Sequence, residues 1–237
     1  AVHSGEYKLG LLRYAVEYEK HFKETLEEKG LAGELVAELP GVLVMNRQHP
    51  LAQKAEIVPE DLRDIPHPIF GFVGALQSCI EYDYVEYAAK QKPEWSFAFI
   101  GAEKPGVDLS ALRALPNNHF LGMKPNEQLP QYLAHFDACL NLFAKSDLSK
   151  DVSPLKFYEY LSTGRPIVST KQPDQILQYA PLIEIADSQE EFISACEKSC
   201  SDTAPEQIDA RIEAGRGCSW DSRVAQMCGI LEGQGIL

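Results

Sequence analysis

The sequence predicts an α/β protein with a doubly wound parallel sheet of the Rossmann-like type. Two observations lead to this prediction. From Pro68 onward, short apolar runs alternate with segments of helical spacing, and several of these runs end at a glycine. Apolar strands that alternate with helices are typical of a parallel sheet whose two faces are covered by crossover helices.

Taken in order, the elements divide the chain into two parts. Residues 6–30 have helical spacing, 41–45 predict a short strand, and 46–66 resemble a linker rich in Pro, Gln and Asp. Strands are then expected at 69–73, 95–100, 119–121, 138–142 and 166–169, with helices at 83–92, 128–135, 155–163, 188–200, 204–215 and 220–231. We therefore expect a partial N-terminal segment and linker over 1–65, and a nucleotide-binding type of domain with C-terminal helices over 66–237.

Charge and hydropathy exclude several classes of protein. The chain has 22 basic and 35 acidic residues, a net charge of −13, and no dense run of Lys or Arg. Nucleic-acid binding requires a basic surface, so no nucleic-acid partner is expected, whereas a nucleotide can be bound by backbone amides and one cation. No apolar stretch is long enough for a transmembrane segment, and the N-terminus lacks the layout of a signal peptide.

The six cysteines form no CxxC pair and no zinc-like spacing with histidine. We expect free thiols, no metal site and no cofactor. Free thiols fit a reducing, cytoplasmic location, which includes a peripheral position at the inner membrane face.

The most informative segment runs from Asp151 to Pro166. Ser153 is a natural N-cap and Pro154 suits the first helical position, so the first-turn amides are predicted to point outward at the positive end of the helix dipole. Such a helix start can bind phosphate, and Lys156 adds a cation. Glu159 could accept hydrogen bonds from two sugar hydroxyls. The residues alone equally allow a plain capped helix with a solvated Glu159.

The run SPLKFYEYLSTGRPIVST (153–170) resembles the nucleotide-binding helix of a large group of bacterial GT-B fold glycosyltransferases that use nucleoside diphosphate sugars. The resemblance implies that Glu159 binds the ribose hydroxyls. It also implies that Asp151, where relatives have Glu, lies near the donor sugar as a candidate catalytic residue. The diphosphate would face the backbone of Ser153, Pro154 and Leu155, next to Lys156, although Pro154 has no N–H to donate.

Three further stretches resemble the same domain. PIFGFVGAL (68–76) corresponds to its first strand and glycine loop, with Gly74 close to a phosphate. Relatives carry Arg or Lys soon after this loop, but LQSCIEYDYVEY (76–87) has neither. The resemblance of the stretch 117–143 implies that Gly122, Met123 and Lys124 lie near the base, and a plain strand-ending turn is the alternative for Gly122. In CSWDSRVAQM (218–227), the resemblance makes Trp220 an anchor for a helix that crosses back toward the N-terminal domain, and ordinary burial of Trp220 is the alternative.

The resemblance implies a donor-binding domain that transfers a sugar to an unidentified acceptor, with retention and without an essential metal. Relatives commonly build cell-surface polysaccharides, and the acceptor-binding N-terminal domain is expected to be missing from this chain. Three alternatives remain open at this point. They are a non-catalytic nucleotide-binding or interaction domain, a sugar-nucleotide epimerase, for which no acid or base residues can be named, and a receiver-like or flavodoxin-like module.

Overall fold

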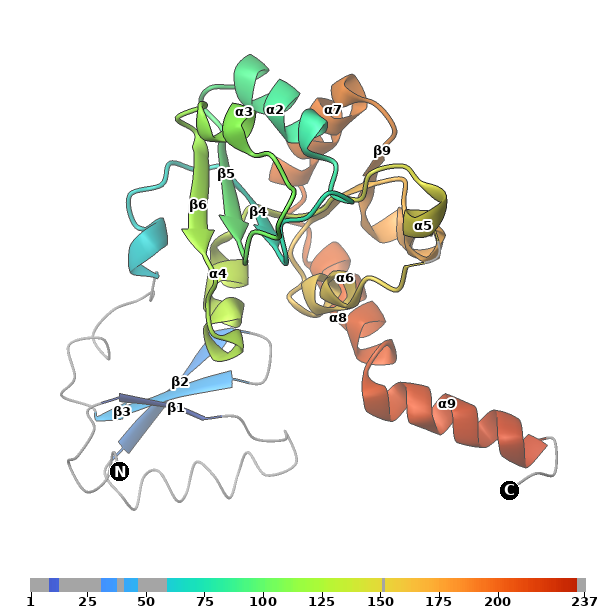
Figure 1. Ribbon diagram of the computed structural model, residues 1–237. Helices are drawn as coiled ribbons and strands as arrows, with labels where there is room; N and C mark the ends of the chain where they lie inside the picture. Colours follow the sequence, from blue (N-terminus) through green and yellow to red (C-terminus); the bar gives the residue numbers. More distant parts are fainter. Residues whose placement is uncertain (1–8, 13–30, 38–40, 47–58, 151, 234–237) are drawn as a thin grey trace.

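In the computed structural model, the described residues are 9–12, 31–37, 41–46, 59–150 and 152–233 (Figure 1). They form two separate sheets. The smaller is antiparallel, in the order β1-β3-β2, and contains β1 (Leu9–Leu12), β2 (Leu31–Ala37) and β3 (Gly41–Asn46). The strand expected at 41–45 is thus confirmed. The helix expected over 6–30 is wrong at Leu9–Leu12, which pair with β3, and the remainder of that range lies outside the described residues.

The larger sheet has six parallel strands in the order β6-β5-β4-β7-β8-β9, which confirms the predicted fold class. Its strands are β4 (Ile69–Val73), β5 (Ser96–Ile100), β6 (Asn118–Gly122), β7 (Ala138–Asn141), β8 (Ile167–Thr170) and β9 (Glu184–Ala186). Strand β9 is absent from the predicted elements, because three residues are too few to show a pattern. The strand order reverses between β4 and β7, since β5 and β6 follow β4 on one side and β7, β8 and β9 extend to the other.

Helices cover both faces of this sheet (Figure 1). The α-helices are α2 (Tyr82–Gln91), α3 (Ser110–Arg113), α4 (Leu129–His135), α5 (Asp147–Lys150), α6 (Leu155–Ser162), α7 (Gln189–Cys200), α8 (Pro205–Gly217) and α9 (Trp220–Gly233). Short 3₁₀ segments are η3 (Glu60–Leu62), η4 (Asn126–Gln128) and η5 (Asp174–Leu182). One core cluster joins α2, α3 and α7 to the sheet, and a second joins α4 and α6 to the opposite face.

Alternation along the central strands produces these two clusters. Phe70 and Phe72 of β4 enter the first cluster, whereas Ile69 and Val73 enter the second. Position 71 of β4 is a glycine because the end of helix α4 approaches the strand closely there. A Cβ built on Gly71 would lie 2.0 Å from the Phe136 ring, so a larger residue would push that ring out of the core.

The last helix, α9, buries none of its residues. Trp220 is 75% exposed, so the alternative of an ordinarily buried tryptophan is wrong. Val224, Met227 and Ile230 are also exposed. None of the described helices combines the length and apolar character needed to cross a membrane.

Candidate functional site

Three glycines mark the carboxyl edge of the sheet where β4, β5 and β6 end. Gly74 donates its N–H to the carbonyl of Ile100 at 2.8 Å, and Gly101 donates to the carbonyl of Gly122 at 2.9 Å. Gly74, Gly101 and Gly122 all have positive φ, at 148°, 151° and 69°. A Cβ on Gly101 would lie 1.9 Å from the Gly74 carbonyl oxygen, so this position tolerates no side chain. Gly74 and Gly122 are among the residues predicted from the sequence and Gly101 is not, although the same strand-then-glycine pattern marks it.

Helix α6 begins at this edge, one residue later than a Ser153 cap requires. Pro154 occupies the N-cap position with non-helical angles (φ −83°, ψ 88°), and no side chain caps the helix. The predicted Ser153 cap is therefore wrong, because ψ of Pro154 turns the chain away from the helix there. The Pro154 carbonyl accepts the Phe157 N–H at 2.9 Å. Within the described part of the chain, the amides of Leu155 and Lys156 have no hydrogen-bond partner, so both are available to an anion.

Lys156 places a cation next to the Gly74 loop. Its Nζ lies 3.9 Å from the centroid of the Phe72 ring and 4.9 Å from that of Phe143. A Cβ built on Gly74 would be 3.5 Å from the same Nζ. No carboxylate among the described residues forms an ion pair with Lys156. Desolvation lowers the pKa of Lys156 from 10.5 to about 7, and the nearby Cys79 thiol opposes this shift weakly.

Glu159 lies one turn further along α6. The residue as a whole is exposed, but partial burial of its carboxyl raises the pKa of Glu159. No described residue forms a hydrogen bond with it, so its oxygens are free to accept bonds from a ligand. Asp151, the candidate catalytic residue, lies outside the described residues.

The residues expected near a base behave differently from one another. Met123 is 78% exposed, and a Cβ on Gly122 would meet nothing within 4 Å, so the β6 end is open to solvent. Lys124 instead forms an ion pair with Asp61, and the Tyr132 hydroxyl donates to the same carboxylate at 2.7 Å. The hydrogen bond from Lys124 lowers the pKa of Asp61, with Tyr132 adding to the effect. Lys124 is therefore engaged in fixing the segment before β4.

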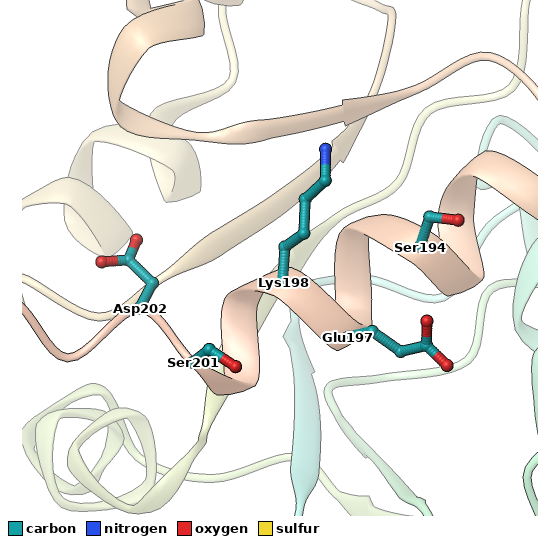
Figure 2. A pocket seen from close by; sticks show the side chains of 5 residues that line it. All are labelled: Ser194, Glu197, Lys198, Ser201 and Asp202. Atoms are coloured by element: carbon teal, nitrogen blue, oxygen red, sulfur yellow. The ribbon is translucent and has the colours of Figure 1, made fainter.

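A shallow, open depression elsewhere on the surface is a poor candidate for a binding site. It is lined by residues of the second half of α7 and the turn that follows: Ser194, Glu197, Lys198, Ser201 and Asp202 (Figure 2). Its charges already have partners, since Glu197 bonds Lys92 at 2.6 Å and Lys198 lies 3.4 Å from Glu184. Lys92 follows α2 and leads into the amino end of β5, so this depression lies away from the carboxyl edge.

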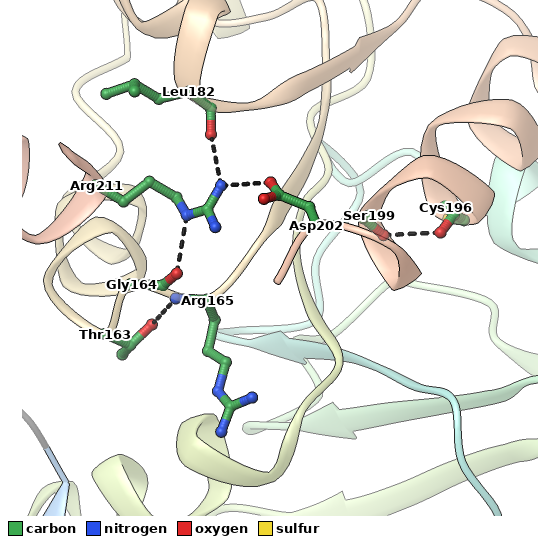
Figure 3. A network of polar contacts seen from close by, with 8 residues as sticks. All are labelled: Thr163, Gly164, Arg165, Leu182, Cys196, Ser199, Asp202 and Arg211. Carbon is green, nitrogen blue, oxygen red and sulfur yellow. Dashed lines mark hydrogen bonds and ion pairs between the residues drawn. The ribbon is translucent and has the colours of Figure 1, made fainter. Parts of the chain in front are cut away.

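Behind the candidate site, a buried arginine holds α8 against the end of α6. Arg211 is fully buried and donates to the carbonyl of Gly164 at 2.8 Å, to that of Leu182 at 3.3 Å and to Asp202 at 2.6 Å (Figure 3). Gly164 has a φ of +70°, and a Cβ there would lie 2.7 Å from Ile208 of α8. The close contact of the two helices thus depends on a glycine and one buried guanidinium.

Metal-ligand chemistry is not indicated in the part of the chain that the structure describes. That part contains no group of three His, Cys, Asp or Glu side chains placed to hold an ion. The six cysteines are free thiols.

Comparison with known proteins identifies a relative in sequence and similar solved structures. No protein-family model matches the chain. Over 135 residues, which are 55% of this chain, it is 30% identical to TuaH of Bacillus subtilis (strain 168), a glycosyltransferase provisionally assigned to teichuronic acid biosynthesis. The match covers 34% of TuaH.

Two solved structures share the fold. Anabaena Alr3699/HepE in complex with UDP superposes with a TM-score of 0.55 at 16% identity, over 70% of this chain and 49% of that one. Sucrose-phosphate synthase from Thermosynechococcus elongatus gives a TM-score of 0.53 at 16% identity, over 72% and 46%. The chain thus spans about half the length of these two proteins. The resemblance stated from the sequence is confirmed: the described six-stranded α/β unit has the fold of the C-terminal domain of a GT-B glycosyltransferase.

Proposed function

We propose that this chain is the donor-binding half of a glycosyltransferase and binds a nucleoside diphosphate sugar at the carboxyl edge of its six-stranded sheet. One observation carries the proposal. The Lys156 ammonium, which pairs with no carboxylate among the described residues, lies beside Gly74 at the open amino end of α6. Ligands of doubly wound folds bind at this edge, where the strand order reverses.

The proposed chemistry is departure of the nucleoside diphosphate from the sugar. Negative charge grows on the diphosphate as the bond to the sugar breaks, and fixed donors that face it stabilise the transition state. The amides of Leu155 and Lys156 and the Lys156 ammonium are such donors, and Gly74 leaves the space in which the diphosphate can approach them. Because the loop after Gly74 has no Arg or Lys before Lys90, Lys156 is the cation that we assign to this role.

The remaining contacts are assigned from the resemblance to GT-B glycosyltransferases. Glu159 is assigned to the ribose hydroxyls, and the open surface at Gly122 and Met123 to the base. Asp151 is assigned to the donor sugar, and the Ser153–Pro154 backbone is assigned to the diphosphate. The acceptor, a cell-surface polysaccharide precursor in this proposal, would be bound by a separate N-terminal domain. We propose transfer with retention, no essential metal, and a cytoplasmic location that includes the inner membrane face.

The relatives guide the choice of ligand. TuaH is provisionally assigned to teichuronic acid biosynthesis, which supports a polysaccharide as the product. HepE was solved with UDP, so uracil is the first base to test.

Replacing Glu159 with alanine should weaken nucleotide binding by about 1–3 kcal/mol, because charge-assisted hydrogen bonds to the ribose are lost. The sharper readout is discrimination between UDP and 2′-deoxy-UDP by calorimetry. The wild-type chain should prefer the ribonucleotide, and Glu159→Ala should bind both equally. Glu213→Ala, an exposed glutamate on α8, serves as the matched control and should keep the preference. Full retention of the preference in a folded Glu159→Ala variant would remove Glu159 from the ribose site.

A further inference from the structure

The sheet opens between β4 and β7 just below the candidate site. These strands pair only at Phe70 with Ala138 and at Gly71 with Cys139. On its other side, β4 stays paired with β5 as far as Val73 and Ile100. The edge of β4 that faces β7 therefore loses its strand partner after Gly71, although Val73 is still buried.

A single hydroxyl from α6 replaces the missing strand. The Tyr160 hydroxyl accepts the Val73 N–H at 2.9 Å and donates to the Val73 carbonyl at 3.1 Å. A tyrosine hydroxyl can donate one bond and accept others, so one atom satisfies both backbone groups. Tyr160 is fully buried, and its contact with Val73 joins residues 87 positions apart in the sequence.

This contact links the two structures that would hold a diphosphate. Val73 directly precedes Gly74, whose loop lies at one side of the candidate site. Tyr160 belongs to the helix whose first turn, with Lys156, lies at the other side. A bond between them fixes the distance across the point where strand order reverses, which is where doubly wound folds bind their ligands.

We propose that Tyr160 is a positioning residue that holds the Gly74 loop at a fixed separation from the amino end of α6, so that one diphosphate contacts both. This inference rests on the proposed function and deepens it, because it assigns the spacing of the phosphate site to one hydroxyl. A tyrosine that only fills the core would need its ring and not this bond. The two roles predict different results when the hydroxyl alone is removed.

The test uses the whole chain with Tyr160→Phe, which keeps the ring, and Tyr179→Phe as the control, whose hydroxyl contacts Cys218 at 3.0 Å. Affinity is measured by calorimetry for UDP and for uridine. If the wild type binds another nucleoside diphosphate instead, that diphosphate and its nucleoside are used. Tyr160→Phe should weaken the diphosphate about tenfold and the nucleoside less than about twofold, a difference of about 1 kcal/mol or more between the two ligands. Equal losses for both ligands, or no loss, would overturn the positioning role, and Tyr179→Phe should change neither.

Amide hydrogen exchange tests the same role without any ligand. Tyr160→Phe should speed exchange at Val73 and through the Gly74 loop, whereas the amides of β5 and β8 should keep their wild-type rates. Uniformly faster exchange would show a general loss of stability and overturn the inference. If the wild-type chain binds no nucleotide, the proposed function fails, and the exchange pattern still decides whether Tyr160 holds the loop to the helix.

Discussion

Arg211→Met is expected to destabilise the protein by about 3 kcal/mol, since removing one partner of a buried ion pair typically costs about 3–5 kcal/mol. The low end applies because the Asp202 side chain keeps 29% of its exposure and can be rehydrated. The carbonyls of Gly164 and Leu182 also lose their donor. For a domain of this size, the loss corresponds to a fall in melting temperature of about 6–12 °C.

The same helix supplies a control for this experiment. Arg216 of α8 forms an i,i+3 pair with Glu213, and both side chains are about three-quarters exposed. Exposed pairs contribute little, so Arg216→Met should change stability by less than about 0.5 kcal/mol. Thermal and urea unfolding of both variants measure the difference. Similar small effects for the two arginines would contradict the role given to the Arg211 network.

Lys156→Met, in contrast to Arg211→Met, should stabilise the protein while it weakens nucleotide binding. Among the described residues the Lys156 ammonium has no carboxylate partner, and the two phenylalanine rings offset only part of its desolvation. We expect the variant to gain about 1–3 kcal/mol at pH 7, as active-site substitutions often do, and to bind a nucleoside diphosphate at least about tenfold more weakly. Calorimetry and urea unfolding measure the two effects. Unchanged affinity, or a loss of stability, would contradict this account of Lys156.

The pH dependence of both effects follows from the lowered pKa of Lys156. The unfolded chain keeps this lysine protonated up to about pH 10, whereas the folded protein releases the proton near pH 7, so wild-type stability rises with pH between these values. The stability gain of Lys156→Met should therefore shrink as pH is raised from 7 toward 10. Binding requires the charged form, so affinity for a nucleoside diphosphate sugar should fall as pH rises above 7.

Lys156→Arg separates this titration from others in the site. Arginine stays protonated across the whole range, so this variant should bind with an affinity that changes little between pH 6 and 9. A nucleoside diphosphate sugar is the better ligand here, because it has no terminal phosphate whose own second pKa lies near 6. Cys79 acts on Lys156 electrostatically, and Cys79→Ser tests how much it contributes. If the affinity of the wild type changed with pH as little as that of Lys156→Arg, Lys156 would be excluded as the titrating group.

Much of the larger sheet can be predicted from the sequence because burial on both faces leaves a clear pattern. The runs at Phe70 and Phe97 are continuous and apolar, and both form central strands. Strand β9 is too short to show a pattern, and η5 has Pro181 within it and no regular period. The N-terminal prediction fails at Leu9–Leu12 because pairing with β3, a contact distant in sequence, overrides the local helical spacing.

The candidate site is predictable only in its outline. Glycine after a strand and Lys after Ser-Pro can be recognised locally, which is why Gly74 and Lys156 are identified from the sequence. The bond from Tyr160 to Val73 and the enclosure of Lys156 by two rings depend on residues far apart in the chain, so no local pattern reveals them. The Ser153 cap fails for a local reason, since Pro154 adopts a non-helical ψ and delays the start of α6.

Calorimetric titration of this chain with UDP, GDP and ADP, in parallel with Lys156→Met, decides whether a donor diphosphate binds at the amino end of α6. We expect saturable binding of one nucleotide by the wild type and a loss of at least about tenfold in the variant. Circular dichroism of both proteins establishes that the variant is folded. Absence of binding of any of the three by the folded wild type, or equal binding by Lys156→Met, would contradict the assignment of a donor diphosphate site at the amino end of α6.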